Sequence, residues 1–89
     1  MAIFIVERQF ADELELTDAA ADGVNRINAD ESVRWLYSFL SADKRKTYCL
    51  YEAPSAEAIR RAAVRAGLPA DVIVEVTDRL MPDASLAEI

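Results

Sequence analysis

The chain of 89 residues has no histidine, a single cysteine, two glycines and three prolines. Without histidine, a Ser-His-Asp relay cannot form, and imidazole is missing as a metal ligand. Cys49 has no partner for an intrachain disulfide, as is usual for a protein of a reducing compartment. The two glycines are too few and too far apart to make a phosphate-binding loop.

Positive charge is also scarce, with 10 lysines and arginines against 16 aspartates and glutamates and a net charge of −6. Binding to a nucleic-acid backbone needs clustered positive charge, so we expect no nucleic-acid partner. No apolar run reaches the ~18 residues of a membrane span, and the N-terminus enters a strand-like run without a signal sequence. We therefore expect a soluble cytoplasmic protein with no membrane partner.

What the sequence does contain is an alternation of strand and helix patterns. Four apolar runs are typical of strands, and two amphipathic segments are typical of helices. One of these segments lies between the first and second runs, and the other lies between the third and fourth. The order predicts an α+β fold, a ferredoxin-like βαββαβ sandwich with a four-stranded antiparallel sheet and two helices on one face. We assign this domain to residues 1–81 and a C-terminal tail to residues 82–89. The predicted strands are Ala2–Phe10, Val33–Leu40, Lys46–Glu52 and Val72–Leu80.

Capping residues define both helices. Thr17 and Ser55 are suitable N-caps, because their hydroxyl groups can accept a hydrogen bond from the first helical turn. Gly67 is suited to the left-handed position after the second helix, with Leu68 as the apolar residue that follows it. Gly23 lies inside the first helix, where a small residue would allow the helix to approach the sheet.

The predicted strands carry apolar residues on both faces. Because two helices cover only one face of a four-stranded sheet, the other face must be covered by something else. A second copy of the chain is the simplest cover, and its burial would add to the thin stability of a small domain. The sequence thus predicts a homodimer through the open sheet face.

Several side chains on adjacent strands are candidates for ligand binding. Strict alternation places Val33, Trp35, Tyr37 and Phe39 on one face of the second strand. In the third strand it places Thr47, Cys49 and Tyr51 on one side and Tyr48 on the other. These aromatic residues could line a cavity for a flat organic ligand or pack in the core and dimer interface. The candidate ligand-binding residues are Glu7, Trp35, Tyr37, Tyr48, Cys49 and Tyr51.

Each of the two non-aromatic candidates has a structural alternative. Glu7 and Arg8 follow a buried strand and point to opposite faces, so they cannot simply pair with each other. Glu7 either projects into a pocket between the sheet and a partner or forms an ion pair with Arg34 or Arg79. Cys49 is expected to pack as a small apolar residue, and we assign no metal ligand.

Motifs along almost the whole chain resemble a small bacterial family of unknown function. Phe4–Phe10 resembles the family's opening YxVERxF, and further matches are Val33–Trp35, Tyr48–Pro54, Glu57–Arg60 and Ala66–Asp71. Members are often named nickel-binding proteins and are similar to dimeric α+β barrels, so the resemblance implies this fold and dimer. This chain departs from the family at Ile59–Ala63, where relatives often carry a histidine.

Two functions remain open from the sequence. The first is binding of a small molecule or a metal, as the resemblance implies, with no cofactor predicted from the residues and nickel implied by the resemblance alone. The alternative is a cofactor-independent enzyme of the monooxygenase, isomerase or cyclase type, acting on a small aromatic or polyketide-like substrate. That alternative depends on fold analogy and predicts an open pocket lined by Glu7, tyrosines and Cys49.

Overall fold

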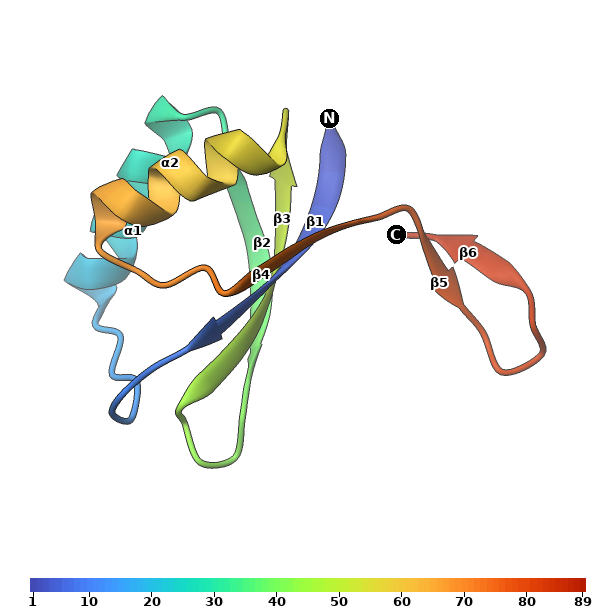
Figure 1. Ribbon diagram of the computed structural model, residues 1–89, viewed down its shortest axis with the longest axis horizontal. Coiled ribbons are helices and arrows are strands. Elements are labelled where there is room, and N and C mark those ends of the chain that lie inside the picture. The colour runs from blue at the N-terminus through green and yellow to red at the C-terminus, as the bar shows by residue number, and fades with distance from the viewer.

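A four-stranded antiparallel sheet and two helices form the body of the protein (Figure 1). The computed structural model describes residues 1–89, and the strand order in this sheet is β2-β3-β1-β4. The element order and the antiparallel sheet confirm the predicted α+β sandwich. The elements are β1 (Ala2–Gln9), α1 (Asp18–Asp30), β2 (Arg34–Leu40), β3 (Lys46–Ala53), α2 (Ala56–Ala66), β4 (Val72–Val76), β5 (Asp78–Leu80) and β6 (Leu86–Glu88).

The helices begin and end at the residues that the sequence indicates. The hydroxyl of Thr17 accepts a hydrogen bond from the amide of Ala20 at 3.1 Å, and that of Ser55 accepts from Ala58 at 3.2 Å. Gly67 adopts φ 68° after α2, where a residue without a side chain avoids strain. The amide of Leu68 then bonds to the carbonyl of Ala63 at 3.0 Å, as in a Schellman motif.

The core lies between α2 and the two central strands. Phe4 and Val6 of β1 and Cys49 and Tyr51 of β3 point toward the helices and are buried. From α2, Ile59 and the small side chains of three alanines fill the space above them. The alanines allow α2 to lie close to the sheet, and they leave this end of the sandwich well packed.

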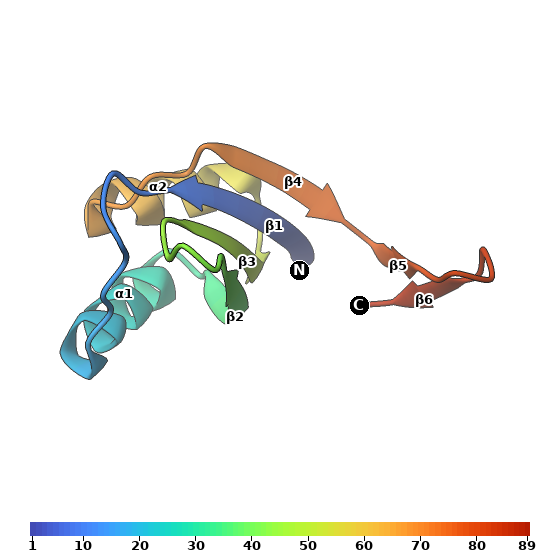
Figure 2. The same cartoon turned by 90° about the horizontal axis from the view of Figure 1, so that it is seen from below.

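Helix α1 lies on the same side of the sheet but stands away from it (Figure 2). It contacts α2 and the edge strand β2, and Asn28 near its end is its only buried residue. The expectation that Gly23 allows a close approach is wrong, since a Cβ placed there would meet no atom within 4 Å. The side of the sandwich under α1 is therefore hollow.

Strand β2 contains a bulge that changes the faces predicted for it. The register with β3 shifts between Trp35 and Tyr37, so that Leu36 is the extra residue. Strict alternation placed Trp35 and Tyr37 on one face; instead Trp35 opposes Tyr51 on the helix side, and Tyr37 opposes Leu50 on the other. A bulge adds one residue to one strand and reverses the facing of everything that follows.

The sheet face opposite the helices is apolar and uncovered within one chain. We call it the open face. Tyr37 and Phe39 lie there edge to face, with ring centroids 5.7 Å apart, and are 53% and 63% exposed. The strand registers place Ile3, Ile5, Glu7, Tyr37, Phe39, Tyr48, Leu50, Val72, Val74 and Val76 on it, with the polar residues Gln9, Arg34, Lys46 and Glu52 near the strand ends.

The C-terminal segment forms a hairpin that projects from the body (Figures 1 and 2). The predicted strand Val72–Leu80 ends at Val76, and its last residues form β5, which pairs with β6 instead of continuing the sheet. Leu80 and Leu86 face each other in this hairpin and are largely exposed. Neither of the two α-helices in the chain is long and apolar enough to span a membrane.

Candidate functional site

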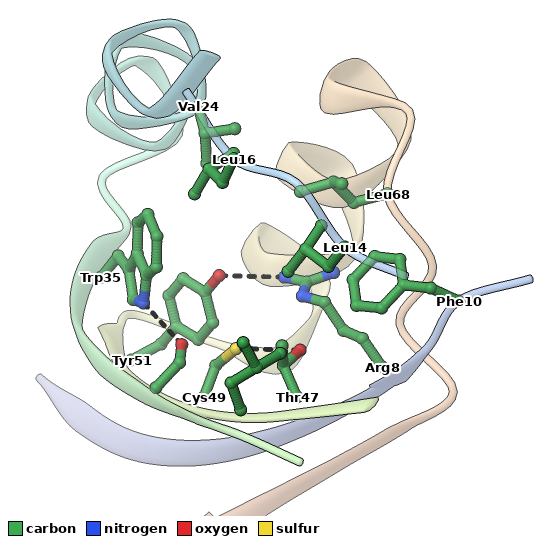
Figure 3. A pocket seen from close by; sticks show the side chains of 12 residues that line it. Arg8, Phe10, Leu14, Leu16, Val24, Trp35, Thr47, Cys49, Tyr51 and Leu68 are labelled. Carbon is green, nitrogen blue, oxygen red and sulfur yellow. Dashed lines mark hydrogen bonds between the residues drawn. The ribbon is translucent and has the colours of Figure 1, made fainter. Parts of the chain in front are cut away.

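The hollow under α1 is a pocket of about 210 Å³ between the helices and the sheet. Figure 3 shows its walls, which come from the end of β1, the connector to α1, α1 itself, strands β2 and β3, and Leu68 after the C-cap of α2. The wall is mostly apolar, and Leu16 and Leu40 at its rim are about half exposed. We call it the helix–sheet pocket; its lining residues are Arg8, Phe10, Leu14, Leu16, Val24, Trp35, Ser38, Leu40, Thr47, Cys49, Tyr51 and Leu68.

Arg8 is the only charged residue of this wall, and it is only 4% exposed. It follows Phe4 and Val6 in the alternation of β1, so its side chain enters the sandwich (Figure 3). One terminal nitrogen of its guanidinium donates to the carbonyl of Pro69, and the other donates to the hydroxyl of Tyr51 at 3.0 Å. Its charge also lies 5.6 Å from the Tyr51 ring centroid. None of the ion pairs in the chain includes Arg8.

Tyr51 presents a neutral hydroxyl beside this charge. Burial raises the pKa of Tyr51 above its ordinary value of 10.0, although the positive charge of Arg8 acts in the opposite direction. Because the hydroxyl accepts from Arg8, its own proton is available for donation to another group. Cys49 lies next to it with its thiol 3.5 Å from the hydroxyl of Thr47. The floor of the pocket thus carries hydrogen-bond donors and no carboxylate.

Trp35 forms the wall on the side of β2. Its indole N–H donates to the hydroxyl of Ser38 at 2.8 Å, across the bulge at Leu36. This bond satisfies both polar groups and fixes the indole plane against the pocket, as Figure 3 shows. Trp35 is half-buried and also contacts the core, so it contributes both to packing and to the pocket wall.

The six candidate residues are divided between the two faces of the sheet. Trp35, Cys49 and Tyr51 line the helix–sheet pocket. Glu7, Tyr37 and Tyr48 lie on the open face, so the structure does not bring all six together. The combination of Glu7 with Cys49 around one pocket, which the enzyme alternative predicted, is not formed within the chain.

Glu7 does form an ion pair, but with a different partner from those expected. Its carboxylate lies 3.4 Å from the ammonium of Lys46, rather than close to Arg34 or Arg79. The same ammonium lies 5.1 Å from the ring centroid of Tyr48, so the three side chains form one partly exposed group. Glu7 is therefore paired with Lys46 on the open face, which is the opposite side of the sheet from the pocket.

Sequence reasoning did not select Arg8 as a site residue, although a signal for it was present. Arg8 lies on the same face of β1 as Phe4 and Val6, because side chains alternate along a strand. Since Phe4 and Val6 are buried, this position predicts an inward side chain for Arg8. Phe10, Leu14 and Leu68 were also missed. They belong to connectors, whose course over the sheet cannot be read from periodicity.

The chain offers no set of ligands suited to nickel. No three His, Cys, Asp or Glu side chains lie close enough together to hold a metal ion. The only thiol, Cys49, is buried beside Thr47 and has no second thiolate or imidazole near it. The residues present therefore do not fit a nickel ion.

The fold makes this chain a small α+β sandwich protein, and in it a buried arginine lies in an apolar pocket between the helices and the sheet. The family profile described as "Nickel responsive protein SCO4226-like" matches residues 4–76, and the chain belongs to this family. A crystal structure of SCO4226 from Streptomyces coelicolor A3(2) is similar, with 32% sequence identity and a TM-score of 0.71. The alignment covers 84% of this chain and 95% of that one. No curated protein matches the chain significantly.

Proposed function

We propose that this protein binds a small, largely apolar organic molecule in the helix–sheet pocket. The observation that carries the proposal is the shape of the sandwich: α2 lies close to the sheet, whereas α1 stands away and the side chains between leave about 210 Å³. Protein interiors normally contain few voids larger than a water molecule. A hollow of this size costs stability, which indicates that it is kept for a ligand.

The volume sets the size of the ligand. A cavity of about 150 Å³ holds benzene, and drug-sized molecules need about 300 Å³ or more. The helix–sheet pocket lies between these values. It therefore suits a single ring with a short substituent, or an aliphatic chain of similar bulk.

Filling the pocket from within tests this function. We expect Val24→Phe, which adds a ring from α1 into the pocket, to abolish binding of 2-phenylethanol observed by NMR titration. The matched control is Val64→Phe, because Val64 lies on α2 and is 80% exposed. The control should bind as the wild type does. Unchanged binding in Val24→Phe would place the ligand elsewhere.

The family is named for a response to nickel, but we do not propose that this chain binds nickel. Because the chain lacks histidine and a cluster of ligands, we expect calorimetry with nickel chloride to detect no tight site. Micromolar or tighter binding at one ion per chain would contradict this expectation and would require ligands that this arrangement does not bring together.

We also propose that two copies associate through the open face. Large exposed apolar patches on a small protein mark interaction sites, and Tyr37, Phe39 and Val74 are all about half exposed or more. The hairpin β5–β6 supports this proposal, because an isolated two-stranded hairpin is at best marginally stable in water. It packs extensively against no other element of its own chain, so a second copy is the cover that would stabilise it.

The association is tested by sedimentation at micromolar concentration. The wild type should have twice the mass of one chain, and Phe39→Lys, which places a charge within the proposed interface, should shift it to a monomer. Val64→Lys adds the same charge on exposed α2 and should remain dimeric. A wild type that stays monomeric would refute the proposal.

A further inference from the structure

The charge of Arg8 lacks an anionic partner in the chain. A guanidinium remains protonated at any physiological pH, so burial cannot be relieved by loss of a proton. Buried charges in proteins are nearly always paired, because removing an ion from water is costly. Here the side chain is 4% exposed, and no carboxylate lies within ion-pair distance of it.

The bonds that Arg8 makes use only part of its capacity. A guanidinium has five N–H donors, and those to Pro69 and Tyr51 account for two of them, one on each terminal nitrogen. The ring of Tyr51 adds a cation–π contact. Both acceptors are neutral, so three donors and the net positive charge remain for a group that enters the pocket.

We propose that the ligand of the helix–sheet pocket is a small organic monocarboxylate with an apolar body. This inference rests on the proposed function and names the class of ligand. The carboxylate pairs with the free N–H groups of Arg8 and accepts a hydrogen bond from the Tyr51 hydroxyl. The apolar body lies against Trp35, Val24 and Leu14 of the same wall.

The charge and the geometry of the pocket select a carboxylate over other anions. The planar fork of a guanidinium matches the two oxygens of a carboxylate in a bidentate arrangement. A phosphate monoester would bring up to two negative charges, and Arg8 is the only cation in the wall. The remaining wall is almost entirely apolar and cannot compensate a second charge.

Four probes share a phenyl ring and differ in the polar group, so their affinities show the effect of charge apart from that of the apolar body. They are phenylacetate, 2-phenylethanol, 2-phenylethylamine and phenyl phosphate. Their dissociation constants are measured by NMR titration at pH 7 on the full chain. We expect phenylacetate to bind at least tenfold more tightly than the alcohol, and the amine to bind most weakly. Phenyl phosphate should bind more weakly than phenylacetate.

Two variants test whether Arg8 causes the preference for phenylacetate over the alcohol. Arg8→Met should bind the alcohol as the wild type does and lose the preference for phenylacetate. Arg60→Met, at an exposed position of α2 that pairs with Glu57, should keep it. The preference among the probes in the wild type tests the inference even if Arg8→Met does not fold.

The outcomes distinguish this inference from the function on which it rests. Equal binding of phenylacetate and the alcohol in the wild type would overturn the carboxylate and leave the pocket as a site for neutral molecules. Tighter binding of phenyl phosphate would overturn the class of anion. If none of the four probes binds, both the inference and the proposed function are wrong.

Discussion

Replacing Arg8 by methionine distinguishes an arginine retained for a ligand from one retained for folding. Methionine has a stem of similar length and no charge. The substitution removes two charge-assisted hydrogen bonds, at about 1.5–3 kcal/mol each, and a cation–π contact of about 0.5–2 kcal/mol. In return it removes a desolvation cost of several kcal/mol and buries an apolar side chain that contributes roughly 1.5–3 kcal/mol.

The stabilisation lost with the hydrogen bonds and the stabilisation gained with the apolar side chain are nearly equal. We therefore expect the free energy of unfolding of Arg8→Met to lie within about 1.5 kcal/mol of the wild type. Urea unfolding followed by circular dichroism measures it. Ile59→Ala is the reference for the loss of a core side chain, because Ile59 is 1% exposed. Its truncation should lower the free energy of unfolding by about 2–5 kcal/mol.

The reasoning is refuted if Arg8→Met loses stability as Ile59→Ala does. Such a loss would show that the bonds to Pro69 and Tyr51 hold the end of α2 and the sheet together and more than offset the burial of the charge. Arg8 would then be a structural residue. The unpaired charge would no longer point to a ligand.

Three further predictions concern the pocket wall and the helix end. Trp35→Ala should lower the free energy of unfolding by about 2–3 kcal/mol. This is less than the roughly 3–5 kcal/mol lost when a fully buried aromatic residue is truncated, because Trp35 is only half-buried. A melting temperature within a degree or two of the wild type would contradict this packing. Gly67→Ala should cost about 1 kcal/mol by thermal melt, from backbone strain alone, since φ is 68° and no atom lies within 4 Å of an added Cβ. In an ultraviolet pH titration, Tyr51 should ionise above its ordinary pKa of 10.0, because burial raises its pKa; this contribution to stability is present below pH 10.0 and is lost as the pH rises through the folded-state pKa.

The parts of the fold that could be predicted from sequence are those that local chemistry determines. Helix α2 has Ser55 before it, an apolar stripe along it and Gly67 after it, and each of these signals acts within a few residues. The faces of β3 were also predicted correctly, because Cys49 and Tyr51 alternate with Tyr48 and Leu50 without interruption. Local signals therefore sufficed wherever the backbone stayed regular.

The site was only partly predictable, for two physical reasons. The spacing of Val24 and Ile27 shows which side of α1 faces inward, but spacing carries no information on how far a helix stands from the sheet. The bulge at Leu36 is invisible to alternation, because every residue around it is compatible with either face. Trp35 and Tyr37 were consequently assigned to one face and lie on two.

The extra residue in β2 makes both faces of the sheet depend on the length of one strand. If Leu36 were paired in a regular ladder, Tyr37 and Phe39 would turn inward and occupy the hollow that Trp35 and Ser38 now border. Deleting Leu36 itself would leave every other side chain where it is, whereas deleting Ser38 would let Leu36 pair and turn Tyr37 inward, with Phe39 still opposite Tyr48. In evolutionary terms, gain of a single codon after Tyr37 would replace an aromatic ring by a serine on the pocket side and expose that ring on the other face, in one event.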